Sequence, residues 1–488
     1  MASPLDDLEP RILWQQFDAI RQIPRASKNE EQIAAYVLDF AAKHGLEAVR
    51  DGVGNVIVRV PATKGHEQAP ATVLQGHLDM VAEKNSDVAF DFDQDPIAVR
   101  VEGDLLLATG TTLGADNGMG VAGGLAVAID EGAVHGPLEL LFTVDEETGL
   151  TGAAGLDGKL LKGRRMLNLD TEEDGALYVG CAGGCTTNTT IPLVRGDLRP
   201  GTTPLRIKVL GLRGGHSGCD IHESRGNAIK LATRVVRHLW HAGLPLELVS
   251  LTGGSKHNAI PREADAVVRV AKGDIARAEA MVKDVEASFK GEFGGIDPEL
   301  KVVVEAAGPA AEKARPMSLD TASRVHRALA ACPHGVLGMS RDVPGLVETS
   351  NNLAVVTTEE DKVVVVTSSR SSVAEALHST LDQVRAVFRL AGGEPKNADA
   401  YPGWKPDMAS PVLATTKKVF TQLFGKEPAI KAIHAGLECG ILGEKIPGID
   451  MVSFGPQIEN PHSPGELCRI STVARFYSLL KGVLKELA

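Results

Sequence analysis

The chain has 488 residues, a length that favours two to four domains over one. Hydrophobic residues make up 43% and charged residues 23%, which is typical of a globular protein with large apolar cores. The formal net charge of −12, without a cluster of Lys and Arg, argues against a nucleic-acid or anionic-membrane partner.

The first part of the chain predicts alternating helices and strands. Its start, MASPLDDLEP, is acidic and is not a secretory signal, so we expect a cytoplasmic protein. Ile12, Phe17, Ile20 and Ile23 recur at helical spacing, and a second helix is predicted from Asn29 to about Lys43. Further elements are predicted as strands at 55–60, 72–75, 138–144 and 165–169, and as a helix at 122–132. This alternation predicts a mostly parallel sheet covered on both faces.

The pattern changes after about residue 187. Alternating, β-rich runs occur at 205–212, 246–251, 265–270, 301–306, 352–358 and 362–368. Helices are predicted between them near 226–241, 275–290, 318–330 and 373–390. Together they predict two βαβ-type halves that build an antiparallel sheet, inserted into the first domain. The inserted domain is thus about twice the length of one such unit.

The last part of the chain returns to the first domain. The Pro/Gly-rich segment 391–406 is interpreted as a linker, followed by a strand at 450–454 and a final helix near 471–485. We therefore expect a first domain of residues 1–187 and 396–488, and an inserted domain of residues 188–395. The six cysteines form no CxxC pair, so reduced and mostly buried thiols are expected rather than a metal site.

Residues that can bind metal follow several predicted strands. These residues are His77 and Asp79 after the strand at 72–75, Glu146 and Glu147 after 138–144, Asp170 after 165–169, and His462 after 450–454. In an open α/β sheet, ligands bind at the carboxyl ends of the strands, so these side chains should converge. One acidic residue after a strand is usually a helix N-cap. The prediction therefore depends on the whole set.

The ligand types indicate zinc, with cobalt or manganese as possible substitutes, because imidazoles and carboxylates occur together. His77 and Asp79 are two residues apart and would point to the same side of a strand, so Asp79 can accept the free ring N–H of His77. Glu146 and Glu147 are adjacent and would point different ways. One could then bind metal while the other faces the reacting water.

Asp116 precedes a predicted helix in the stretch GTTLGADNGMGVAGG (110–124) and could bridge two metals. The same stretch contains GMGVAG, a literal match to the dinucleotide-binding pattern. No apolar strand comes directly before it, so a nucleotide-binding oxidoreductase is a remote alternative. The glycines are better explained by close packing of the helix on the sheet.

Together these motifs resemble the co-catalytic zinc peptidases that include carnosinases, peptidase T and aminoacylases. The resemblance covers essentially the whole chain. It is carried, in this order, by GHLDMV (76–81), GADNG (114–118), DEETG (145–149), NLDTEE (168–173) and ENPHSPGE (459–466). It implies an α/β catalytic domain with a mixed, mostly parallel sheet, and an inserted α+β lid domain with an antiparallel sheet.

The resemblance also implies a site with two zinc ions per chain. Asp116 would bridge both ions, His77 and Asp170 would hold one, and Glu147 and His462 would hold the other. Glu146 would be the general base, Asp79 the carboxylate behind His77, and a cis peptide bond would join Asp116 to Asn117. The residues that would contact substrate are His216, which would also hold the developing oxyanion, Asn258, Arg370 and Gly436.

The implied activity is that of a metalloprotease, a hydrolase that cleaves dipeptides with a water held between the two zinc ions. The segments 211–228, 253–263 and 434–440 resemble those of family members that prefer Xaa-His dipeptides such as carnosine, so the resemblance implies this preference. A small peptide is the expected partner and a homodimer the expected assembly, in which His216 could serve its own subunit or the other. The alternatives are an amidohydrolase, carboxypeptidase or tripeptidase of the same family, and a metal-bound peptide-binding protein without catalysis.

Overall fold

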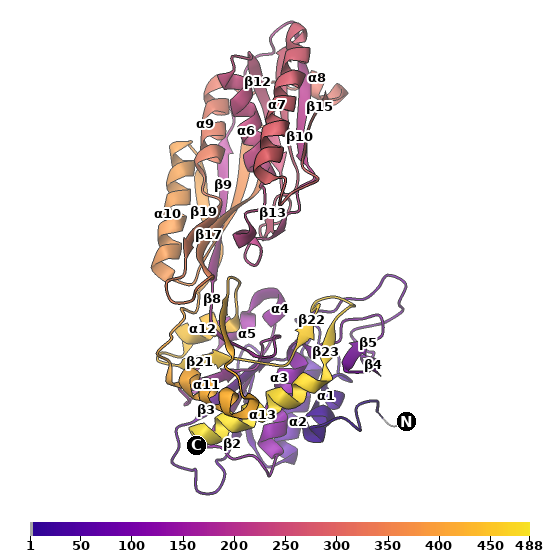
Figure 1. The fold of residues 1–488 in the computed structure, drawn as a ribbon, viewed down its shortest axis with the longest axis vertical. Helices are drawn as coiled ribbons and strands as arrows, with labels where there is room; N and C mark the ends of the chain where they lie inside the picture. The colour runs from indigo at the N-terminus through magenta and orange to yellow at the C-terminus, as the bar shows by residue number, and fades with distance from the viewer. Residues whose placement is uncertain (1–2) are drawn as a thin grey trace. The chain divides into compact units, whose positions relative to one another are not determined.

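The computed structural model describes residues 3–488, which form two compact units with separate hydrophobic cores (Figure 1). One unit contains the chain up to Gly180 together with Trp404–Ala432 and Leu437–Ala488. The other contains Cys181–Gly403 and Ile433–Gly436, and is therefore an insertion into the first.

The first unit is built on an eight-stranded mixed sheet. The strands are, in spatial order, β1 (Glu47–Arg50), β2 (Val56–Val60), β6 (Leu138–Thr143), β3 (Thr72–His77), β7 (Arg165–Asn168), β21 (Asp450–Ser453), β8 (Ala176–Cys181) and β20 (Ala429–Ile433). The four central strands, β6, β3, β7 and β21, are parallel, whereas β2 and β8 run antiparallel to their central neighbours. β3 and β6 are buried at every position, as parallel strands covered on both faces require.

Helices and a small second sheet complete the first unit. The helices are α1 (Arg11–Ile20), α2 (Glu31–Lys43), α3 (Ala115–Ile129), α4 (Glu146–Gly149), α5 (Thr151–Gly155), α11 (Pro411–Phe424), α12 (Glu438–Lys445) and α13 (Ile470–Leu487). The second sheet contains β22 (Ile458–Glu459), β23 (Leu467–Arg469), β5 (Leu105–Ala108) and β4 (Val99–Glu102). A short 3₁₀ helix covers Gly158–Leu160.

Glycines let helix α3 lie directly against the sheet. A Cβ atom on Gly76 of β3 would lie 2.3 Å from Oδ1 of Asn117, and one on Gly120 would lie 2.4 Å from the same atom. The segment GMGVAG lies inside α3, where all of its residues are buried. It is therefore a packing surface, and the dinucleotide alternative is wrong because no exposed loop is left to hold a phosphate.

The inserted unit is built on a nine-stranded antiparallel sheet. Its strands are, in spatial order, β15 (Lys301–Ala306), β10 (Thr202–Leu210), β14 (Ala264–Ala271), β12 (Leu246–Gly253), β17 (Val347–Thr358), β18 (Lys362–Ser371), β9 (Gly183–Pro192) and β19 (Glu394–Tyr401), with β16 (Gly335–Met339) also paired to β17. Helices α6 (Ala228–His241), α7 (Ile275–Phe293), α9 (Leu319–Ala331) and α10 (Ala374–Leu390) lie side by side on it (Figure 1). The short elements are β11 (Gly215–His216), β13 (Ala259–Ile260), α8 (Pro309–Glu312), and 3₁₀ turns at Ile221–Glu223 and Lys272–Asp274.

The inserted sheet consists of two halves with the same plan. Each half runs strand, helix, strand, strand, helix, strand: β10-α6-β12-β14-α7-β15 in the first, and β9-α9-β17-β18-α10-β19 in the second. Across the sheet, the strands of the first half lie in the order β15, β10, β14, β12. Those of the second half lie in the corresponding mirror-image order, β17, β18, β9, β19. The two second strands, β12 and β17, pair where the halves meet. The sequence predicts two halves and six of these eight strands, but not β9 and β19. The first half interrupts the second between β9 and α9.

The segment predicted as a linker is in fact an edge strand. β19 pairs with β9 along most of its length, and its Pro395 and polar side chains are tolerated because an edge strand has one unpaired side. For the same reason the units divide after Gly180 and Gly403 rather than after residues 187 and 395, since both β9 and β19 belong to the inserted sheet.

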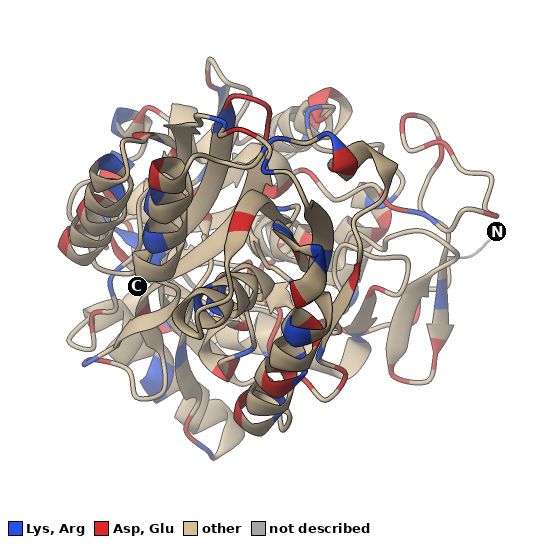
Figure 2. Ribbon diagram, turned by 90° about the horizontal axis from the view of Figure 1, so that it is seen from above, with Lys and Arg blue, Asp and Glu red and all other residues tan. Residues whose placement is uncertain are grey.

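Five of the six cysteines are buried, and Cys219 is exposed. Lys and Arg are interspersed with Asp and Glu on the helices (Figure 2), where pairs such as Arg234 with Glu292 form. Among residues 3–488, no helix is long and apolar enough to cross a bilayer.

Candidate metal centre

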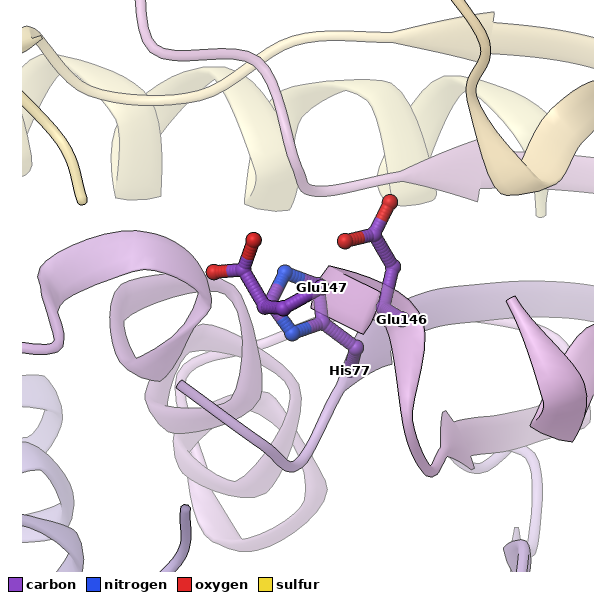
Figure 3. A group of neighbouring side chains, drawn as sticks. All are labelled: His77, Glu146 and Glu147. Atoms are coloured by element: carbon purple, nitrogen blue, oxygen red, sulfur yellow. The ribbon is translucent and has the colours of Figure 1, made fainter. Parts of the chain in front are cut away.

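The carboxyl ends of three adjacent parallel strands bring the predicted ligands together. His77 is the last residue of β3, Glu147 lies on α4 directly after β6, and Asp170 follows β7. Figure 3 shows His77 beside both glutamates at this edge. Asp116 lies in the first turn of α3, and His462 follows β22.

The candidate ligand atoms form two groups that share Asp116. His77, Asp116 and Asp170 make up one group, and Asp116, Glu147 and His462 make up the other, with the atoms of each group within 4.8 Å of one another. Oδ1 of Asp116 lies 3.1 Å from Nε2 of His77, and Oδ2 lies 3.2 Å from Nε2 of His462. The two oxygens of one carboxylate thus face the two groups. The peptide bond between Asp116 and Asn117 is cis, as the resemblance implies.

The donor atoms fit divalent cations. Nε2 of His77 lies 3.2 Å from Oδ1 of Asp170, and Nε2 of His462 lies 3.0 Å from Oε2 of Glu147. Oε1 of Glu147 is buried without a hydrogen-bond partner among the described residues. Buried carboxylate oxygens that gather around imidazole nitrogens need positive charge between them. Mixed nitrogen and carboxylate donors are the set that zinc prefers.

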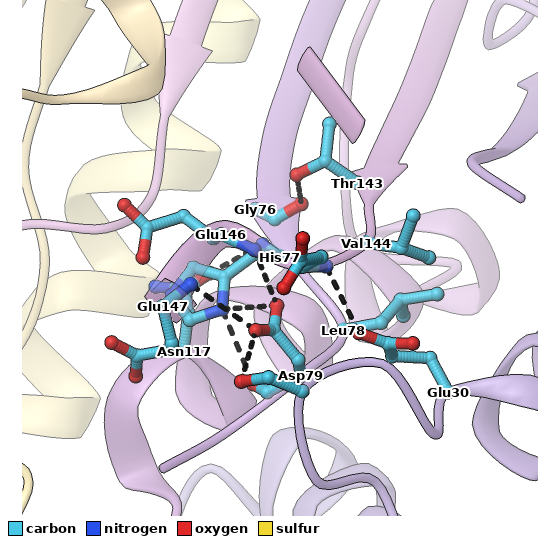
Figure 4. Close-up of polar contacts among 12 residues, drawn as sticks. Glu30, Gly76, His77, Leu78, Asp79, Asn117, Thr143, Val144, Glu146 and Glu147 are labelled. Atoms are coloured by element: carbon cyan, nitrogen blue, oxygen red, sulfur yellow. Dashed lines mark hydrogen bonds and ion pairs between the residues drawn. The ribbon is translucent and has the colours of Figure 1, made fainter. Parts of the chain in front are cut away.

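Asp79 lies behind His77, as the sequence predicts. Its Oδ1 is 3.3 Å from Nδ1 of His77, so the ring N–H is directed at Asp79 and Nε2 is left for a metal. The carboxylate also accepts a hydrogen bond from Ser27 Oγ at 2.8 Å. The backbone N–H groups of Glu146 and Glu147 donate to it at 3.0 and 3.2 Å (Figure 4). Burial opposes the charged form, but the hydrogen bonds of His77 and these groups lower the pKa of Asp79 to about 2.

Glu146 and Glu147 are the first two residues of helix α4 and do not lie on a strand. Neighbours on a helix point roughly 100° apart, so the two side chains still diverge, although not to opposite faces as a strand would require. An oxygen of Glu146 lies in one group with the ligand atoms of His77 and Glu147. Burial, together with the nearby carboxylates of Asp170 and Glu438, raises the pKa of Glu146 well above its ordinary value against the effect of His77.

The predicted substrate residues lie in the inserted unit, where they form two neighbouring pairs. His216 on β11 pairs with Ala259 of β13, and the carbonyl of Asn258 accepts the backbone N–H of Ser217 at 2.8 Å. Arg370 on β18 donates from Nη1 to the hydroxyl of Tyr401 at 2.8 Å.

Tyr401 also connects Arg370 to Gly436. A Cβ atom on Gly436 would lie 2.8 Å from the ring of Tyr401, so only glycine fits there. The two pairs meet at His434, because a Cβ on Gly218 would lie 2.2 Å from the carbonyl oxygen of His434. Arg370 is 7% exposed and has no ion-pair partner among residues 3–488, so this buried cation is available to an anion.

The ring of His216 is held in one tautomer. The backbone N–H groups of Gly218 and Cys219 donate to Nδ1 at 3.3 and 3.0 Å. Nδ1 must therefore be an acceptor, and the proton of the neutral ring is on Nε2. Burial, together with the nearby charge of Arg370, lowers the pKa of His216 from its ordinary value. His216 is thus a neutral hydrogen-bond donor.

Several buried carboxylates of the first unit were not predicted as site residues, and three of them, Asp145, Glu438 and Glu466, lie in quoted motifs. Glu438 opens α12 and accepts hydrogen bonds from Gln75 Nε2 and Thr143 Oγ1, both at 2.6 Å. Its burial raises its pKa to about 8. Glu466 ends the segment ENPHSPGE and is 2% exposed. The only sequence signal for Glu438 is an acidic side chain inside the largely apolar and glycine-rich segment 434–440, whereas nothing singles out Glu466 in the polar segment 459–466.

Residues 73–486 match the family described as peptidase family M20/M25/M40. The chain is 41% identical over 486 residues to the cytosol non-specific dipeptidase of Escherichia coli K12, with 99% of each chain covered. It is also similar to the crystal structure of aminoacylhistidine dipeptidase from Vibrio alginolyticus, with a TM-score of 0.92, 42% identity, and 99% of this chain and 98% of that chain covered. The aminopeptidase PepT of Bacillus cereus shares the fold at 16% identity and a TM-score of 0.58, with 98% of this chain and 99% of that chain covered.

Proposed function

Because the chain belongs to peptidase family M20/M25/M40, we propose that it is a metal-dependent dipeptidase that hydrolyses Xaa-His dipeptides, carnosine among them. The family expected from the motifs is confirmed. The observation that carries the proposal is the pair of ligand groups that share Asp116, with Glu146 beside them. The names of the two relatives support a dipeptide substrate, and one of them supports a C-terminal histidine.

His77, Asp116 and Asp170 would hold one zinc ion, and Asp116, Glu147 and His462 the other. When bound, the two ions polarise the scissile carbonyl and lower the pKa of an attacking water. Glu146 removes the proton from that water and delivers it to the leaving amine. Asp79 fixes the tautomer of His77, and its hydrogen bonds hold the start of α4, where Glu146 lies.

The inserted unit supplies groups that bind the substrate. Nε2–H of His216 donates to the oxyanion that develops on the carbonyl. Arg370 binds the C-terminal carboxylate of the dipeptide, and its planar guanidinium can do so with two hydrogen bonds. Asn258 and Gly436 line the same region. Because the C-terminal carboxylate of the substrate is bound in one position, short peptides are favoured.

His216 belongs to the first half of the inserted sheet and Arg370 to the second half of the same chain. The charge of Arg370 lowers the pKa of His216, so the two residues are near each other within one polypeptide. We also propose a homodimer, because edge strand β15 has no neighbouring strand on its outer side among residues 3–488 and exposes Val303. A cytosolic location follows from the name of the Escherichia coli relative.

Turnover of a substrate panel tests the function. The protein is stripped with a chelator, supplied with zinc, cobalt or manganese, and assayed with carnosine, other Xaa-His dipeptides, dipeptides without histidine, tripeptides and N-acyl amino acids. We expect metal-dependent cleavage of dipeptides, fastest with a C-terminal histidine. Faster cleavage of tripeptides or N-acyl amino acids would favour the other activities of the family. Zinc binding without turnover of any substrate would favour a peptide-binding protein.

A further inference from the structure

The carboxylate of Glu466 is surrounded by four consecutive backbone N–H groups. Oε2 accepts from Leu113 at 2.8 Å and from Gly114 at 3.0 Å. Oε1 accepts from Ala115 at 2.8 Å and from Asp116 at 3.3 Å. Gly114 is the N-cap residue of α3 and Ala115 and Asp116 are its first two residues, so three of these groups are unpaired donors of the helix start, and Gly114 has no side chain to satisfy them. A residue some 350 positions away in sequence therefore caps the helix that presents Asp116.

Arg25 ties a third segment to the same place. Its side chain is 2% exposed, and Nη1 donates to the carbonyl oxygens of Leu78 at 3.0 Å and Asp79 at 2.8 Å. Nη2 donates to the carbonyl of Gly114. Gly114 has a φ of +68°, and a Cβ there would lie 2.5 Å from Nη2 of Arg25. Both the backbone conformation and the contact with Arg25 therefore require glycine at this position.

Three segments that carry predicted metal ligands are thus joined by two buried side chains. The segments are 77–79, 113–116 and 462–466. Arg25 joins the first to the second, and Glu466 joins the second to the third. Neither side chain is itself within a ligand group. Both side chains bind backbone groups rather than side chains. They therefore fix the positions of the backbone segments from which the side chains of His77, Asp116 and His462 extend.

We propose that Glu466 and Arg25 are positioning residues, which fix the bridging carboxylate of Asp116 relative to the two histidines and so set the affinity for metal. This inference rests on the proposed function, in that it takes the two ligand groups as metal sites. A charged acceptor of several N–H groups makes strong hydrogen bonds, and losing it leaves buried donors unpaired. In Glu466→Gln, the side-chain NH₂ would face backbone N–H groups, donor against donor. The turn before Asp116 would then move.

Glu139 provides a matched control within the same unit. It is 4% exposed, and its carboxylate also accepts backbone N–H groups, from Lys162 at 2.9 Å and Gly163 at 2.8 Å. The turn that it holds carries no predicted ligand. Glu139→Gln should therefore cost stability by the same mechanism as Glu466→Gln without changing a metal site.

The test compares zinc affinity and stability in the wild type, Glu466→Gln, Arg25→Lys and Glu139→Gln. Affinity is measured on the full-length, chelator-stripped chain by competition with a chromophoric zinc chelator, and stability by urea unfolding of the stripped chain. We expect Glu466→Gln to bind zinc about 10- to 100-fold more weakly, the usual effect of a residue that orients ligands. Arg25→Lys should change affinity in the same direction, and Glu139→Gln should bind as the wild type does.

Wild-type affinity in a folded Glu466→Gln chain would overturn the inference, as would an equal loss of affinity in Glu139→Gln. If Glu466→Gln does not fold, Arg25→Lys decides, since it keeps the charge but cannot reach all three carbonyls. Failure of the proposed function gives a different result, because the wild type itself would then bind fewer than two zinc ions or cleave no dipeptide.

Discussion

Oδ1 of Asp79 accepts the backbone N–H of Glu146 at 3.0 Å, and the same oxygen lies 3.3 Å from Nδ1 of His77. One buried carboxylate therefore orients a predicted ligand at the end of β3 and also holds the first turn of α4. The position of the predicted base and the tautomer of a predicted ligand are not independent, and a change at Asp79 should affect both.

Asp79→Asn should lower both zinc affinity and turnover, each by about 10- to 100-fold. The amide keeps the size of the carboxylate, but it loses the charge and places NH₂ against an N–H donor. Zinc content after dialysis and turnover at saturating zinc measure the two effects. Ser27→Ala is the control, because it removes a single hydrogen bond from Asp79 and should have a much smaller effect.

Glu146→Gln should abolish most turnover while both metals stay bound. Glutamine cannot take a proton at neutral pH, and loss of a general base typically costs about 10²- to 10⁴-fold. Glu147→Gln should lose zinc instead, and added zinc should restore part of its activity. Turnover and zinc content are measured side by side for the two variants. Metal loss in Glu146→Gln alone would mean that the roles are reversed.

Asp116→Ala should remove both zinc ions, whereas the wild type should bind two per chain. Each ligand group uses one oxygen of this carboxylate, so its loss weakens both. Elemental analysis after removal of excess zinc gives the stoichiometry. One zinc ion in the wild type would contradict the two-metal assignment, and one in Asp116→Ala would show that the groups do not share this residue.

His216→Ala should keep both metals and lose roughly 10²-fold or more in turnover, the scale of one oxyanion donor. The N–H groups of Gly218 and Cys219 make Nδ1 an acceptor, so ¹⁵N shifts of the labelled ring should report the Nε2–H tautomer. A ring protonated on Nδ1, or normal turnover in the variant, would leave His216 with a structural role only.

The free energy of unfolding should decrease as the pH is lowered from about 6.5 to about 3, because of His434. Burial, with the charge of Arg370, lowers the pKa of this 6% exposed ring to about 3. Below pH 6.5 the ring of His434 is protonated in the unfolded chain but stays neutral in the folded chain. The free energy of unfolding therefore decreases by up to about 1.4 kcal/mol per pH unit. His434→Gln, which can keep the hydrogen bond to Ser350, should have a shallower pH dependence in urea unfolding. Exposed His378→Gln should leave it unchanged.

The metal centre could be predicted from sequence because strand ends and ligand residues coincide. His77, Asp170 and the pair Glu146–Glu147 each follow an apolar run, and parallel strands must end at one edge. Glu466 and Arg25 could not be predicted, since they act on backbone groups far away in sequence. β19 could not be recognised as a strand from its sequence, because an edge strand can have polar side chains and tolerates proline. The divergence of Glu146 and Glu147 could be predicted from their adjacency after the strand, but the short helix α4 on which both lie could not.

The arrangement of the inserted sheet in two joined halves affects how the sequences of those halves can diverge. In a dimer of identical subunits, any substitution appears twice, at symmetry-related places. Here the two halves are covalently joined, with the first nested inside the second, so each residue changes alone. His216 and Asn258 are in the first half and Arg370 is in the second. In a protein with this arrangement, one half can specialise in binding the reacting carbonyl and the other in binding the end of the substrate. A substitution that suits one half does not have to appear in the other.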